Sequence, residues 1–132
     1  MNFTIKSQEA VQRAMQVAME HENQVIEPGH LLKGILDTDE NVSPFVFKKI
    51  GVNLKIIRQT LDSMIQSYPK VSGAASPYLS RSSSEAFQKA NVYLKELNDE
   101  YVALEHLLLG ILKTNDQVAQ MLKDSCLYIL RF

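Results

Sequence analysis

The chain has 132 residues, of which 45% are hydrophobic and 22% charged, and its formal net charge is −1. This size and composition indicate one globular domain, and the near-neutral charge argues against a nucleic-acid binder, which needs a basic face for the phosphates. No apolar run approaches the roughly 18 residues of a transmembrane helix, and the N-terminus MNFTIKSQ lacks the layout of a signal peptide. The single cysteine, Cys126, cannot form an internal disulfide, so we expect a cytoplasmic protein.

The same ten-residue phrase occurs in both halves of the chain. Residues 27–36 read EPGHLLKGIL and residues 103–112 read ALEHLLLGIL, 76 positions further on. The match extends backwards without a gap, and 13 of the 32 positions from Ser7 to Thr38 are identical to their counterparts. Average composition would give about two identities. The chain therefore contains an internal duplication, and we expect two copies of one structural unit.

The first copy, about 3–68, opens with two predicted helices. Hydrophobic spacing predicts a helix from about Ile5 to Glu22, with the hydroxyl of Thr4 as its N-cap. The repeated phrase predicts a second helix that begins at Pro28. Its neighbouring leucines leave little polar face, so this helix should be central and buried.

Two shorter helices should complete the first copy. Ser43 and Pro44 suit the N-cap and first position of a helix that ends before Gly51. Asn53 suits the N-cap of a fourth helix, which Pro69 stops. The predicted core positions of that fourth helix are Ile57, Leu61, Met64, Ile65 and Tyr68.

The second copy, about 81–126, follows a turn-rich linker at 69–80. Ser80 should cap a helix from about Arg81 to Leu97, and the second central helix should begin near Leu104. No eighth helix is predicted, because the sequence ends in an atypical apolar tail at 127–132. No alternation long enough to predict a strand is present, so the predicted fold is all-α, with two pseudo-symmetric repeats of a roughly four-helix unit and the last helix of the second repeat missing.

These motifs resemble the N-terminal repeat domain of the Clp/Hsp100 AAA+ unfoldases. The paired phrases carry the resemblance, and NFTIKSQEAVQ, IEP at 26–28 and NDEYVALEH at 98–106 are most similar to the ClpB-type disaggregases. The resemblance implies a non-catalytic domain that receives unfolded or aggregated polypeptides and passes them to a hexameric AAA+ ring. It also implies that the ATPase modules, with their ATP and magnesium, lie elsewhere in a longer protein. The chain itself has no G-x-x-x-x-G-K-[ST] loop, and we expect it to hold no cofactor or metal.

The resemblance places three polar substrate-contacting positions at Thr4, Asp99 and Glu105. The alternative is structural: Thr4 serves only as an N-cap, and the two carboxylates only favour the positive end of the helix near Leu104. The candidate apolar contacts at helix starts are Phe3, Ile26, Tyr101, Val102 and Leu104. Among these, core packing is expected for Ile26 and Val102, and accessibility for Phe3 and Tyr101.

The duplication predicts an asymmetric binding surface. The first-copy counterparts of Asp99 and Glu105 are Asn23 and Gly29, which carry no charge. In the related ClpC-type proteins an acid at each position serves phosphoarginine recognition, and Gly29 puts that activity in doubt here. We therefore expect binding to concentrate on the second copy's helix starts and the groove between the copies.

No enzymatic site is predicted. His30 and His106 occupy the same place in each copy on a buried helix, which favours structural histidines bonded to a neighbouring helix end. Nothing in the sequence brings Cys126 to a histidine as a nucleophile pair would require. The alternative binding function is an adaptor-docking domain of a ClpA- or ClpC-type unfoldase, and a free-standing helical regulator is a third.

Overall fold

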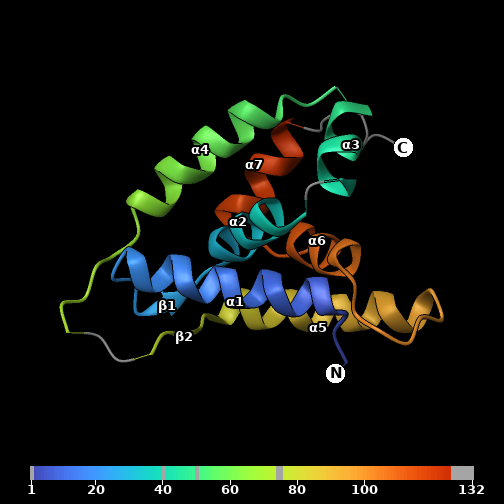
Figure 1. Ribbon diagram of the computed structural model, residues 1–132, viewed down its shortest axis with the longest axis horizontal. Helices are drawn as coiled ribbons and strands as arrows, with labels where there is room; N and C mark the ends of the chain where they lie inside the picture. Colours follow the sequence, from blue (N-terminus) through green and yellow to red (C-terminus); the bar gives the residue numbers. More distant parts are fainter. Residues whose placement is uncertain (1, 40, 50, 74–75, 126–132) are drawn as a thin grey trace.

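The computed structural model describes residues 2–39, 41–49, 51–73 and 76–125. Helices dominate these residues, as predicted (Figure 1). The helices are α1 (Ile5–Glu20), α2 (Pro28–Thr38), α3 (Val42–Lys49), α4 (Leu54–Gln66), α5 (Arg81–Glu96), α6 (Leu104–Leu112) and α7 (Gln117–Ser125), and two short strands are β1 (Val25–Ile26) and β2 (Tyr78–Leu79). Cys126 and the predicted tail at 127–132 lie outside the described residues. Within the described ranges, no helix is long and apolar enough to cross a membrane.

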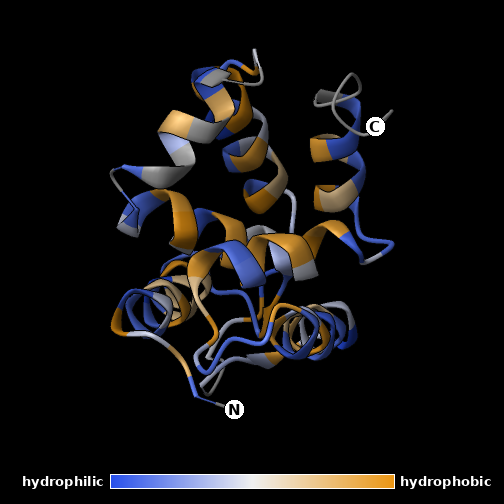
Figure 2. Ribbon diagram, turned by 90° about the vertical axis from the view of Figure 1, so that its right-hand side faces the viewer, coloured by the Kyte–Doolittle hydropathy of each residue, from blue (hydrophilic) through white to orange (hydrophobic). Residues whose placement is uncertain are grey.

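The two repeats form two helical layers. In Figure 1, α1 and α5 run in opposite directions, and in Figure 2 they are seen end on, with α2 and α6 crossing above them. The helix α2 packs mainly on α1, and α6 mainly on α5, while α2 and α6 also contact each other. The helices α4 and α7 pack on the other side of this central pair. The central helices are therefore enclosed, which confirms the prediction from their adjacent leucines.

One glycine in each repeated phrase allows the central helix to approach its neighbour closely. A Cβ atom at Gly34 would lie 3.1 Å from the Ala10 carbonyl carbon and 3.1 Å from the Ala14 nitrogen, and closer still to the Ala10 oxygen. The second repeat reproduces this contact, because a Cβ at Gly110 would lie 3.0 Å from the Ala90 nitrogen. These distances are below ordinary van der Waals contact, so the close packing explains why the phrase keeps glycine in both copies.

Short parallel pairings join one repeat to the other, and no pattern in the sequence predicts them. In the first pairing Val25 lies opposite Tyr78, and Ile26 opposite Leu79. Its pseudo-symmetric counterpart is an isolated bridge between Phe3 and Val102. In each case the segment before the first helix of one repeat pairs with the segment before the central helix of the other. A two-residue pairing shows no alternation along the chain, which is why the sequence did not predict it. The predicted all-α fold class is confirmed.

The predicted ends of two helices need correction. The helix α1 stops at Glu20, and Glu22 has a φ of 55°, in the left-handed region that ends a helix. Asn98 repeats this conformation in the second copy, with a φ of 58°. Ser43 does not cap α3, because the Phe45 N–H already donates to the Asn41 carbonyl at 3.2 Å and the helix begins at Val42.

The other predicted turn and cap residues are confirmed. Gly51 has a φ of +76° after α3, and the Asn53 side chain accepts hydrogen bonds from the first backbone N–H groups of α4. Along α4 the side chains of Ile57, Leu61 and Ile65 are buried, and two further predicted core residues, Met64 and Tyr68, are partly buried against them.

Candidate functional site

An open groove lies where the start of α1 meets the start of α6, and we call it the α6 groove. Thr4 caps α1 by accepting the Ser7 N–H at 3.1 Å, and its own N–H donates to the Val102 carbonyl at 3.0 Å. This pairing holds the first repeat's N-terminus beside the second repeat's central helix. The groove has a volume of about 400 Å³ and is lined by Thr4, Lys6, Asp39, Asn41, Ala103, Leu104 and Glu105. The structure thus brings together three of the predicted site residues, Thr4, Leu104 and Glu105.

Carboxylates come from both repeats at the α6 groove. Glu105 is exposed in the first turn of α6, where the positive end of the helix dipole favours an acid. Asp39 comes from the first repeat, is only 6% exposed, and accepts the Asn41 N–H at 3.0 Å. Lys6 adds one positive charge at the rim, and its Nζ lies 3.7 Å from Glu9 Oε2. An extended segment with backbone amides or basic side chains would find acceptors here.

Asp99 is positioned differently, because it bonds His106. The His106 Nδ1 accepts the Ala103 N–H at 2.8 Å, so Nε2 carries the ring proton and donates to Asp99 Oδ2 at 2.8 Å. The Asp99 carboxylate therefore fixes the start of α6 through the histidine, while its side chain stays 48% exposed. It is absent from the described lining of the α6 groove. The sequence placed His106 correctly as a structural residue but did not pair it with Asp99.

The apolar candidates divide as expected, except for Phe3. Val102 is 0% and Ile26 3% exposed, so both belong to the core. Tyr101 is 53% exposed and accessible. Phe3 was predicted to be accessible, but it is half-buried, with its ring edge against Phe87 at a centroid distance of 5.8 Å.

The first repeat's equivalent of the α6 start is occupied by Tyr68. His30 Nδ1 accepts the Glu27 N–H at 2.9 Å and its Nε2 lies 2.8 Å from Asn23 Oδ1, in parallel with His106. Burial, with a smaller contribution from the charge of His21, lowers the pKa of His30 to about 4. The centroids of the Tyr68 and His30 rings lie 5.0 Å apart, and the Tyr68 hydroxyl lies directly against Gly29. The prediction that Tyr68 belongs to the core did not reveal this role.

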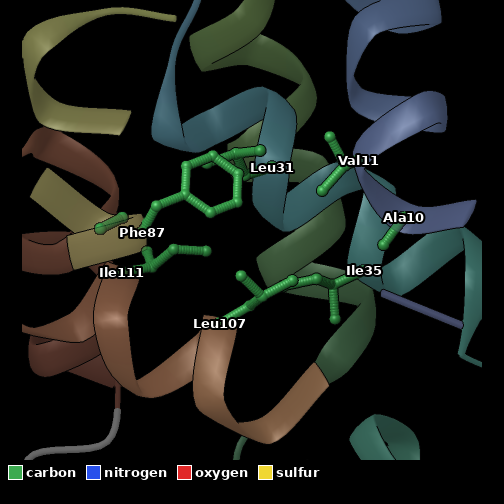
Figure 3. A pocket seen from close by; sticks show the side chains of 8 residues that line it. Ala10, Val11, Leu31, Ile35, Phe87, Leu107 and Ile111 are labelled. Atoms are coloured by element: carbon green, nitrogen blue, oxygen red, sulfur yellow. The ribbon is translucent and has the colours of Figure 1, made fainter. Parts of the chain in front are cut away.

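A second, apolar hollow lies on the seam between the repeats (Figure 3). It holds only about 10 Å³, so it is a packing defect rather than a formed site. Its lining comes from both repeats: Ala10, Val11, Leu31, Ile35, Ala86, Phe87, Leu107 and Ile111. Among the described residues, no group of histidine, cysteine and carboxylate side chains is arranged to hold a metal ion.

Comparison with known proteins identifies the class of protein to which the chain belongs. The profile of the family described as Clp repeat (R) N-terminal domain matches residues 2–125. The chain therefore belongs to this family. The fold agrees, because the N-terminal domain of Hsp104 from Candida albicans superposes with a TM-score of 0.85 at 19% identity, covering 95% of this chain and 82% of that one. The N-terminal domain of the chaperone ClpD from Arabidopsis thaliana gives 0.70 at 21% identity, covering 93% and 85%.

Within the family, the similar curated proteins are ClpB chaperones. The chain is 49% identical over 124 residues to chaperone protein ClpB of Bacteroides thetaiotaomicron, covering 94% of this chain. It is 42% identical over 124 residues to chaperone protein ClpB of Porphyromonas gingivalis, again covering 94%. In both cases the match spans 14% of the relative, at its N-terminal region. The ClpB-type resemblance predicted from the motifs is confirmed.

Proposed function

We propose that this chain is the substrate-receiving domain of a ClpB-like disaggregase and binds exposed segments of unfolded or aggregated proteins. The observation that carries the proposal is the α6 groove, where Thr4, Leu104 and Glu105 converge between the two repeats. Its open form suits a receptor that accepts many sequences, because such a receptor cannot demand strict hydrogen-bond geometry. The similarity to ClpB chaperones supports the same function.

In this proposal the residues have distinct roles. Glu105 attracts amides or basic groups of the client, Leu104 supplies apolar contact, and Thr4 fixes the rim through its cap. Tyr101 offers an exposed ring beside Val102. Asp99 acts as a positioning residue through His106, and Phe3 supports the rim by packing on Phe87.

The remainder of the machine belongs to the proposal as well. The AAA+ hexamer, with ATP and magnesium, is expected in the rest of a longer protein, which would draw in clients collected by this domain. Tethering raises the local concentration of client over the ring without tight binding. A cytoplasmic location and the lack of a cofactor in this chain stay predictions.

A titration with a permanently unfolded model protein tests the proposal. In ¹H–¹⁵N NMR spectra we expect fast-exchange shifts at Thr4, Leu104 and Glu105. Glu105→Gln should weaken binding about fivefold, corresponding to about 1 kcal/mol for one exposed charge contact. The matched control is Glu96→Gln, which removes an exposed carboxylate at the end of α5 and should leave binding unchanged.

Two outcomes would contradict client binding at the α6 groove. One is an absence of shifts there, and the other is equal affinity for the wild type and Glu105→Gln. Saturable one-to-one binding of a folded adaptor, without binding of unfolded chains, would favour the adaptor-docking function instead.

A further inference from the structure

We propose that Tyr68 closes the first repeat's counterpart of the α6 groove, so that the domain offers one client groove rather than two. This inference rests on the proposed function, because that proposal assigns client binding to the open α6 groove. The closure itself rests on the contacts of Tyr68, Asn23 and Gly29.

The two repeats have the same backbone arrangement at the start of their central helices, which would allow a groove in each. Ser80 caps α5 as Thr4 caps α1, and the Ser80 N–H donates to Ile26 at 3.1 Å as the Thr4 N–H donates to Val102. His30 and His106 anchor the two central helices through the same backbone contact. The equivalent residues, 76 positions before or after those that line the α6 groove, form its counterpart: Glu27, Pro28, Gly29, Ser80, Ser82, Asn115 and Gln117.

Tyr68 occupies the space beside Gly29 in this counterpart. A Cβ atom at Gly29, where Glu105 stands in the second repeat, would lie 3.3 Å from Tyr68 Cζ and closer still to the hydroxyl. The phenol therefore occupies the space in which a side chain at this position would begin. Burial raises the pKa of the Tyr68 hydroxyl, and the charges of Asp116 and Glu27 raise it further.

Asn23 holds the closing segment in place, which explains the difference from Asp99. Its Oδ1 meets His30 Nε2 at 2.8 Å, and its Nδ2 donates to the Pro69 carbonyl at 3.0 Å. Asn23 is 3% exposed, and its bond to His30 is fully buried. Asp99 can bond the histidine but has no N–H with which to bind a following carbonyl. Asn23, Gly29 and Tyr68 thus form one set that closes the first groove, and Asp99 and Glu105 stand at the positions of Asn23 and Gly29 in the second repeat.

Accessibility to a neutral nitroxide cosolute tests the closure without any client. In the wild type, NMR relaxation enhancement should be strong at the Glu105 amide and about tenfold weaker at the Gly29 amide. Tyr68→Leu, which keeps an apolar stem, should raise the enhancement at Gly29 to that at Glu105. Tyr78→Leu is the control, since Tyr78 is 59% exposed and should change neither amide. Equal enhancement at both amides in the wild type would overturn the inference, whether or not the variant folds.

The titration with the unfolded client is a second test of the closure. Wild-type shifts should be confined to the α6 groove, and Tyr68→Leu should add shifts at Gly29 and Ser82. Client shifts at Gly29 and Ser82 in the wild type would overturn the inference. A protected Gly29 amide with no client shifts at either groove would keep the closure and overturn the proposed function, so the two failures are distinguishable.

Discussion

At the scale of single residues, the two copies use one histidine in the same way with different partners. His30 and His106 each accept a backbone N–H that precedes a central helix. Beyond that bond, His30 meets the neutral amide of Asn23 and His106 meets the carboxylate of Asp99. One substitution between the copies therefore separates a buried contact with a neutral amide from a half-exposed contact with a carboxylate.

His30 should make the stability of the domain depend on pH. Its pKa of about 4 when folded lies below the ordinary value of 6.5, because burial disfavours the imidazolium. Between these values the unfolded chain binds more protons, so stability falls as the pH drops from 6.5 to 4. The free energy of unfolding should fall by about 3 kcal/mol over this range, since one pKa unit corresponds to about 1.4 kcal/mol.

Urea unfolding at pH 7 and at pH 4.5 measures this dependence. His30→Gln should be less stable at pH 7 but lose less stability on acidification than the wild type. Because both proteins share the same carboxylates, the difference between their slopes isolates the histidine. Identical slopes would show that His30 is not held neutral.

At the scale of elements, the stability of each repeat depends on how closely two helices approach. The central helices α2 and α6 lie against the backbones of α1 and α5 at Gly34 and Gly110. Alanines at Ala10 and Ala14, and at Ala86 and Ala90, are fully buried on the facing side. Small residues on both sides replace side-chain packing with backbone contact, which also brings α2 and α6 together at the seam.

Gly34→Ala and Gly110→Ala should each destabilise the domain by on the order of 2 kcal/mol, because the added methyl group would force the helices apart. The direction is diagnostic, since alanine otherwise stabilises a helix interior by about 1 kcal/mol relative to glycine. Thermal unfolding of both variants measures the change. Gln12→Ala, on the exposed face of α1, is the control and should have little effect. A stabilised Gly34→Ala would contradict the close approach.

At the scale of the whole molecule, the repeats are tied by exchanged segments. The residues before α1 pair with those before α6, and the residues before α5 pair with those before α2. Phe3 extends this exchange, because it belongs to the first repeat and packs on Phe87 in the second. Neither repeat can therefore unfold without exposing groups of the other, and a single cooperative transition is expected.

Phe3→Ala should lower the stability of both repeats together. A half-buried ring makes fewer contacts than a core phenylalanine, whose loss costs about 3–5 kcal/mol, so about 2 kcal/mol is expected here. Calorimetry should show one transition at a lower temperature. Ile5→Ala is the control, because Ile5 is 75% exposed. Two separate transitions in Phe3→Ala would contradict the coupling.

Much of the fold followed from local patterns. The caps at Thr4, Asn53 and Ser80 and the turn at Gly51 form as predicted, because they depend on residues within a few positions in the chain. The predicted start of α3 was wrong, because the helix already begins at Val42, two residues before Pro44. The candidate site was predicted only in part: the sequence supplied Thr4, Leu104 and Glu105 but not Asp39 opposite them.

The sequence by itself determined the duplication, the helices, the buried central phrases and the family, because each leaves a periodic or repeated signal along the chain. Tertiary structure alone decided which segments exchange between repeats, which carboxylate holds which histidine, and that Tyr68 occupies the space beside Gly29. These are contacts between residues far apart in the chain. They depend on the distances between packed helices, and no local pattern encodes those distances.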